Sequence, residues 1–169
     1  MAKTIHAVVR TDEMLATTAS AGLYSVKYND GTDFADIDNG HVVALDSLMK
    51  NEREIWKAVT PAANSDIKQI VLIATPEVMH DERLRNLSDF YNEAGIDARG
   101  YMLHSGDIFS VTAEALDGAD TDAKGKIVEL QADTKMKVVS AATSGSTAIG
   151  SIVDIETVGA LTYYVIRVA

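Results

Sequence analysis

Short apolar runs separated by turn residues recur along most of this chain. Residues 161–168 alternate, so one face of a strand there would carry Tyr164, Ile166 and Val168. The run at 67–74, Ile-Lys-Gln-Ile-Val-Leu-Ile-Ala, is rich in β-branched residues, which favours a buried strand over a helix. Further runs with strand composition occupy 5–10, 23–28, 98–103, 108–113 and 149–155.

One sequence motif, with the pattern expected of a strand, a loop and a second strand, occurs twice. The copy at 40–60 begins Gly-His-Val-Val-Ala-Leu and ends Trp-Lys-Ala-Val-Thr. The copy at 125–140 begins Gly-Lys-Ile-Val-Glu-Leu and ends Met-Lys-Val-Val-Ser. In each copy a turn glycine opens an apolar strand, and a polar excursion (46–55 or 131–135) precedes the second strand. We therefore predict that the two copies superpose as related units of a β scaffold built by duplication.

One helix is predicted, over residues 81–94. Asp81 is a suitable N-cap and Gly95 a suitable C-terminal stop, and apolar residues recur between them at three- and four-residue spacing. We expect one face of this helix to be buried against a sheet. That face consists of Leu84, Leu87, Phe90 and Tyr91.

The expected fold is mainly β: a β-barrel or β-sandwich with the internal repeat and one inserted α-helix, with an α+β arrangement as the fallback. Residues 1–22 contain many small and polar side chains and are expected to form a flexible or extended N-terminal arm. Residues 23–169 would form a single β-rich domain. That domain could divide into two lobes, about 23–75 and 96–169, linked by the helix at 81–94.

Composition and charge narrow the classes of partner. The chain has 169 residues, of which 47% are hydrophobic, enough for a sizeable core. Its formal net charge of −10 disfavours binding to phosphate backbones, so no nucleic-acid partner is expected. Cysteine is absent, which excludes disulfides and thiolate metal sites. Neither a signal peptide nor the roughly 18 apolar residues of a membrane span is recognised, so we expect synthesis in the cytoplasm and no membrane partner.

The residues that could carry chemistry show no catalytic or metal-binding pattern. The four histidines lack metal-ligand spacing, and the link at 143–147 does not match a nucleophile elbow. His80 stands beside two acidic residues, which a helix N-terminus explains more simply than a metal. We predict no catalytic, cofactor-binding or metal-binding residues, and no enzyme. The lone tryptophan, Trp56, would pack in the core or between lobes, or else anchor a partner.

Several sequence segments resemble those of a known class of proteins. The runs at 76–86 and 90–95 (Pro-Glu-Val-Met-His-Asp-Glu-Arg-Leu-Arg-Asn and Phe-Tyr-Asn-Glu-Ala-Gly), together with 106–115 and 125–130, resemble small structural proteins of tailed bacteriophages. Such proteins are typically encoded beside the major capsid protein and are called head decoration, or cement, proteins. The resemblance covers roughly residues 36–169.

The resemblance implies a virion structural protein that binds the outer surface of the capsid and stabilises it. Its partner would be the major capsid protein, with self-association as a dimer or trimer, and it brings no catalytic residues with it. An N-terminal arm that orders on the capsid is also implied. Alternatives are a head fibre base or tail protein, or a small ligand-binding β-barrel or enzyme. The candidate capsid contacts are Thr4, Ile5, Val8, Thr17, Thr18 and Trp56.

Overall fold

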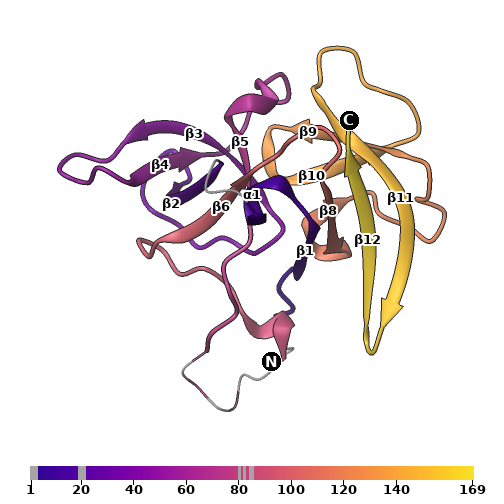
Figure 1. Ribbon diagram of the computed structural model, residues 1–169, viewed down its shortest axis with the longest axis horizontal. Coiled ribbons are helices and arrows are strands. Elements are labelled where there is room, and N and C mark those ends of the chain that lie inside the picture. The colour runs from indigo at the N-terminus through magenta and orange to yellow at the C-terminus, as the bar shows by residue number, and fades with distance from the viewer. Residues whose placement is uncertain (1–3, 19–21, 80, 82, 84–85) are drawn as a thin grey trace.

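The chain forms two β units that lie side by side, a closed barrel and an open sheet (Figure 1). The computed structural model describes residues 4–18, 22–79, 81, 83 and 86–169. Strands hold 43% of the chain, which confirms the predicted mainly β fold. Within the described residues, no helix has the length and apolar character needed to cross a membrane.

The first unit is a closed five-stranded barrel with the strand order β2-β4-β3-β5-β6. β2 runs parallel to β4 and antiparallel to β6, and this last pairing closes the barrel. Two 3-10 turns, η1 and η2, flank β5 along the chain. The bounds are β2 Leu23–Asn29, β3 Val42–Leu48, β4 Ile55–Val59, η1 Ile67–Gln69, β5 Ile70–Ile73, η2 Leu87–Asp89 and β6 Ala98–Met102.

The second unit is a seven-stranded sheet with the order β1-β7-β12-β11-β9-β10-β8. Its strands pair antiparallel except β8 and β10, which are parallel. Its bounds, with those of the short helices beside it, are β1 Val9–Glu13, α1 Leu15–Thr18, β7 Ile108–Thr112, η3 Ala113–Ala115, β8 Leu116–Asp117, β9 Ile127–Gln131, β10 Asp133–Val139, β11 Ala148–Val158 and β12 Leu161–Val168.

β5 explains how the two units share their apolar residues. All four of its residues are buried, so both faces of this strand are covered. Val71 and Ile73 belong to the small core inside the barrel. Ile70 and Leu72 belong to the larger core, which also contains the apolar face of the seven-stranded sheet. A strand buried on both faces has no polar side, which is why its sequence reads Ile-Val-Leu-Ile.

The two predicted copies form equivalent antiparallel hairpins, β3–β4 and β9–β10. Each is entered through a glycine with positive φ, +80° at Gly40 and +83° at Gly125, a conformation that glycine adopts without strain. The Gly40 amide donates to the Ile73 carbonyl at 2.7 Å, and the Gly125 amide donates to the Ile152 carbonyl, also at 2.7 Å. The predicted strand–loop–strand repeat is therefore confirmed as a shared local structure.

The equivalence extends beyond the hairpins. The barrel order β2-β4-β3-β5-β6 matches β8-β10-β9-β11-β12 in the sheet, including the parallel pair in each. The copies differ at the end: β6 closes onto β2, whereas β12 pairs with β7 and leaves the second copy open. The repeat predicted from two short sequence motifs is thus matched by a common order of five strands in each half of the chain.

The predicted helix at 81–94 is wrong for the residues that the structure describes there. The turn η2 takes up only three positions of this range. Leu87 is 46% exposed, and Phe90 and Tyr91 are only half-buried, so they do not form the buried face that we expected. Leu84 lies outside the described residues.

The physical reason is that tertiary partners satisfy the backbone groups that a helix would have paired internally. Asn92 and Ile37 exchange two backbone hydrogen bonds, of 2.8 and 2.9 Å, in an isolated β-bridge. The Ala94 amide donates to the Asp36 carboxylate at 2.8 Å. These contacts hold the segment in an extended path along the loop before β3.

The N-terminal segment is built into the fold. Instead of a separate arm over 1–22, β1 forms an edge strand paired with β7, and α1 follows it. Ala7, Val8 and Met14 are buried, with at most 3% exposure. The part of the predicted arm that the structure describes therefore contributes to the core before any partner is present.

The lobes have different bounds from the expected 23–75 and 96–169. β6 lies after the expected boundary but closes the barrel, so the first lobe runs to residue 102. β1 precedes that lobe in sequence and belongs to the sheet of the second lobe. The chain therefore crosses between the lobes twice, once between β1 and β2 and once through the loop from β6 to β7, and the predicted helix at 81–94 is not the link.

Candidate functional site

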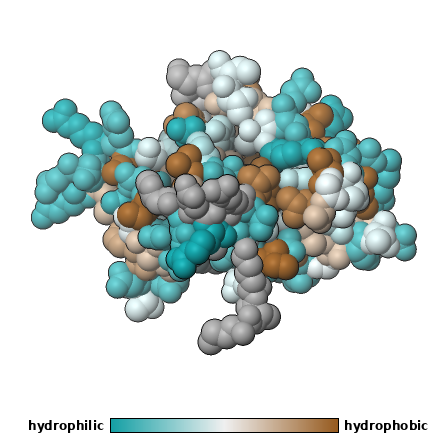
Figure 2. All heavy atoms as spheres, turned by 90° about the horizontal axis from the view of Figure 1, so that it is seen from below, coloured by the Kyte–Doolittle hydropathy of each residue, from teal (hydrophilic) through white to brown (hydrophobic). Residues whose placement is uncertain are grey.

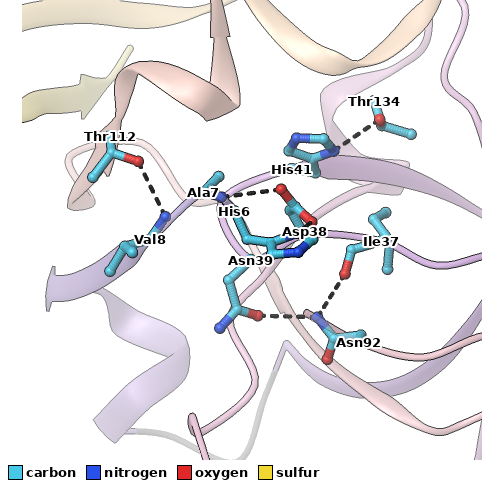
Figure 3. Close-up of polar contacts among 10 residues, drawn as sticks. All are labelled: His6, Ala7, Val8, Ile37, Asp38, Asn39, His41, Asn92, Thr112 and Thr134. Atoms are coloured by element: carbon cyan, nitrogen blue, oxygen red, sulfur yellow. Dashed lines mark hydrogen bonds and ion pairs between the residues drawn. The ribbon is translucent and has the colours of Figure 1, made fainter. Parts of the chain in front are cut away.

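A network of polar side chains joins the segments that lie between the two β units (Figure 3). We call it the polar junction. Its members come from the segment before β1, the loop before β3, the segment after η2, and β10, so residues far apart in sequence meet here. They are His6, Asp38, Asn39, His41, Asn92 and Thr134.

His6 and Asp38 fix the segment that leads into β1. His6 Nδ1 lies 2.8 Å from one Asp38 carboxylate oxygen, and the Ala7 amide donates to the other oxygen at 3.0 Å. The His6 amide donates to the Ser88 carbonyl at 2.9 Å, and its ring stacks on Tyr91 with centroids 4.8 Å apart. The N-terminal segment is therefore held from two sides, by the loop before β3 and by the segment around η2.

Asn39, which is 1% exposed, connects three segments through its amide group. Its Oδ1 accepts from the Thr75 amide at 3.0 Å and from Asn92 Nδ2 at 3.1 Å, and its Nδ2 donates to the Thr75 carbonyl at 2.8 Å. Asn92 Nδ2 also donates to the Ile37 carbonyl at 3.0 Å. Buried amides satisfied in this way specify one arrangement of the chain, because each broken bond would leave an unpaired polar group.

His41 links the barrel to the sheet. It is 9% exposed, and its Nδ1 lies 2.9 Å from the Thr134 hydroxyl on β10. Its Nε2 is buried without a hydrogen-bond partner among the described residues. Burial lowers the pKa of the imidazole below its ordinary value of 6.5, because desolvation disfavours the charged form. Lys135 lowers this pKa further, while Asp38 and Asp133 oppose the shift.

We expect His41 to make the fold less stable in mild acid. The folded protein holds His41 neutral, so below its ordinary pKa of 6.5 the unfolded chain binds a proton that the folded chain does not. The free energy of unfolding therefore falls as the pH drops from 6.5 toward the lowered folded pKa, and this contribution is fully present above 6.5.

The check is thermal unfolding of the wild type and of His41→Asn, which can still bond to Thr134 but does not titrate. The wild type should lose more thermal stability than the variant between about pH 7.5 and about pH 5.5. The two proteins differ only at position 41, so the difference between their losses isolates His41. Equal losses would show that its folded pKa is not lowered.

An open groove of about 680 Å³ lies beside the polar junction. It is lined by the end of β7 and the start of η3, by the N-terminal segment, by η2 and by the turn of the β11–β12 hairpin. Figure 2 views the molecule from the side of this turn, where hydrophobic residues lie among polar ones. We call this feature the apolar groove. Its apolar residues are Ile5, Leu87, Ala113, Val158, Ala160 and Leu161.

Three large side chains of the apolar groove remain open to solvent. Ile5 is 61% exposed, Leu87 is 46% exposed and Val158 is 53% exposed. Ile5 and Leu87 are the chain neighbours of His6 and Ser88. These two residues are joined by a 2.9 Å hydrogen bond from the His6 amide to the Ser88 carbonyl. The two side chains are therefore exposed on segments that a backbone hydrogen bond ties together, and a protein surface where exposed apolar side chains gather is suited to binding a partner.

Glu114 is the one charged residue among those that line the groove in the described structure. Its side chain is half-buried and forms no ion pair with any described residue. Arg10, by contrast, lies 2.9 Å from Glu156 and stacks over the ring of Tyr163 at 4.4 Å from its centroid. A carboxylate without a cation beside apolar side chains favours a partner that supplies one.

The candidate contact residues do not come together. Ile5 lines the apolar groove, whereas Val8 is buried at 1% exposure, so it is not available for contact in this conformation. Trp56 is half-buried against Tyr24 in the barrel core, with ring centroids 6.1 Å apart. The other three candidates are exposed outside the groove: Thr4, Thr17 and Thr18.

The groove residues that sequence reasoning missed are Leu87, Glu114 and Val158. The helical spacing predicts a buried Leu87, whereas the structure places this residue in the 3-10 turn η2, where it is exposed. Val158 precedes Gly159, whose φ of +63° marks the hairpin turn, so an apolar residue beside a turn glycine was the available signal. For Glu114, the sequence offered none.

The polar junction and the apolar groove differ in what their side chains contact. Within the described part of the chain, no three His, Asp or Glu side chains gather closely enough to hold a metal ion. The side chains of the polar junction mostly bond to one another and to the backbone, and so connect segments, whereas the apolar groove presents its side chains outward. Comparison with protein-family models, with curated proteins and with solved structures found no match to this chain.

Proposed function

We propose that this protein is a non-enzymatic structural component of a tailed-phage virion that binds the outer surface of the capsid and stabilises it. The observation that carries the proposal is the apolar groove, an exposed surface whose flanking segments are joined by hydrogen bonds. Exposed apolar side chains that gather on one surface, here together with polar ones, are typical of protein-binding surfaces. The resemblance of residues 36–169 to head decoration proteins supports the capsid as the partner.

The charge and the architecture support the same role. A net charge of −10 keeps the free protein soluble and discourages association with nucleic acid. Many copies on a symmetric shell would place each copy beside its neighbours, so weak individual contacts could add up through effective concentration. The partners would be the major capsid protein and, on the shell, neighbouring copies of this chain as a dimer or trimer.

One observation favours a second candidate, a ligand-binding β-barrel protein. The groove volume of about 680 Å³ lies within the range of small-molecule sites. The groove is open along one side and contains one charged group, whereas small-molecule sites usually enclose the ligand and orient it with several polar groups. Capsid binding is therefore the better explanation.

The test mixes the purified protein with bare shells assembled from the major capsid protein encoded beside it. We expect saturable binding in cosedimentation and a higher temperature of shell disruption, because a ligand that binds only the intact shell stabilises it. No binding to shells would remove the decoration role. Binding to purified tails or head fibres instead would favour the other virion positions.

A further inference from the structure

We propose that the apolar groove binds a segment of the capsid protein that carries apolar side chains and one Lys or Arg, which pairs with Glu114. This inference rests on the proposed function and names the surface and the chemistry of its partner. It replaces a flexible N-terminal arm as the anchor.

The groove joins parts of the chain that are far apart in sequence. Ile5 precedes β1, Leu87 lies in η2, and Val158 ends β11. Their exposed fractions of 61%, 46% and 53% leave apolar surface that could be buried on binding. Burial of apolar surface is favourable at roughly 25 cal/mol per Å², so these side chains can supply affinity.

The groove is preorganised. Its N-terminal wall is held by the 2.8 Å contact of His6 with Asp38 and by the 2.9 Å bond from the His6 amide to Ser88. The η2 wall is further held by the Asn86 amide, which donates to the Asp89 carboxylate at 3.2 Å. A surface ordered before binding loses little conformational entropy when the partner arrives, which leaves more of the contact energy as affinity.

Charge selects the occupant. Glu114 lies in the groove without an ion pair among the described residues, so a partner cation would meet an available carboxylate. A second copy of this chain would bring another net charge of −10 to the same surface, which opposes self-docking there. The same charge opposes a nucleic acid. A basic, apolar segment of a different protein satisfies both the apolar walls and the carboxylate.

Two variants test the groove, each with a matched control. Val158→Asp places a charge on the groove wall, and Leu48→Asp places one on an apolar residue of similar exposure (50%) at the end of β3. Glu114→Lys reverses the groove charge. Glu54→Lys makes the same change in net charge in the exposed loop between β3 and β4. In Figure 1 this loop lies at the left end of the barrel, away from the seven-stranded sheet.

The readout is the affinity of each protein for bare capsid shells, after thermal unfolding has shown which variants remain folded. We expect Val158→Asp and Glu114→Lys to weaken binding about tenfold or more, which corresponds to about 1.4 kcal/mol. Both controls should bind within about twofold of the wild type. Glu114→Gln should also reduce the dependence of binding on salt, because it removes one screened ion pair.

The outcomes separate this inference from the proposed function. If the wild type binds shells and both groove variants bind equally well, the capsid role stands and the groove is not its contact surface. If the wild type does not bind shells, the proposed function fails and this inference fails with it. If sedimentation shows a wild-type dimer that Val158→Asp dissociates, the groove binds a second copy, and a heterologous segment is ruled out.

Discussion

Phe109→Ala is expected to lower the free energy of unfolding by about 3–5 kcal/mol. Phe109 is fully buried on β7, which lies between β1 and β12 in the seven-stranded sheet. It belongs to the core that the sheet shares with the outer face of β5, so removal of its ring would leave a cavity between the two units. Because backbone hydrogen bonds hold β7 on both sides, the cavity could not collapse easily. Urea unfolding followed by circular dichroism gives the measurement.

Leu87→Ala provides the contrast within the same experiment. Leu87 is 46% exposed, so its truncation should change the free energy of unfolding by no more than about 0.5 kcal/mol. This variant should reduce binding at the apolar groove while leaving the fold intact. A large loss of stability for Leu87→Ala, or a small one for Phe109→Ala, would contradict the observed division between core and surface.

Gly150→Ala is expected to cost at least about 3 kcal/mol, at the upper end of the range for overpacking. A Cβ atom built on Gly150 would overlap the Arg167 carbonyl oxygen and lie 3.0 Å from Val168 Cα. These are backbone atoms of the paired strand β12, so no side-chain rotation can relieve the clash. The two strands would have to separate where β11 also pairs with β9.

Ser151→Ala is the control for this position. Ser151 is the next residue of β11, opposite Arg167 in the ladder, and is half-buried. Its substitution adds no atom near β12 and should be close to neutral. We would measure both variants by thermal and urea unfolding. If Gly150→Ala matched the control, β11 and β12 would not approach as closely as the structure shows.

The sequence predicted most of the strands because their signals are local. Alternation at 161–168 became β12, and the uniformly apolar run became β5. The repeated motif of a glycine followed by apolar residues identified two hairpins. Its signal is local because glycine adopts the positive φ seen at Gly40 and Gly125 more readily than other residues. Only the structure showed that the repeat extends through five strands, because β2 and β8 have little sequence in common.

The helix and the N-terminal arm were mispredicted for the same reason. The spacing of Leu84, Leu87 and Tyr91 suits a helix, but Asn92 finds its partners on the loop at Ile37 and Asn39. Likewise, small polar residues suggested a mobile arm, yet β1 pairs antiparallel with β7 as an edge strand of the sheet. The intrinsic helix or strand propensity of a residue is a weak preference, and hydrogen bonds to segments distant in sequence can override it.

By itself, the sequence determined the fold class, the turns, the duplicated hairpins and the acidic charge. Each of these depends on residue type and on spacing along the chain. The tertiary structure alone decided which apolar residues stay at the surface. Ile5, Leu87 and Val158 become neighbours only when the polar junction brings the N-terminal segment and η2 beside the β11–β12 turn. Whether an apolar side chain is buried or exposed depends on which other segments pack over it. Long-range packing determines this, and the local sequence pattern does not.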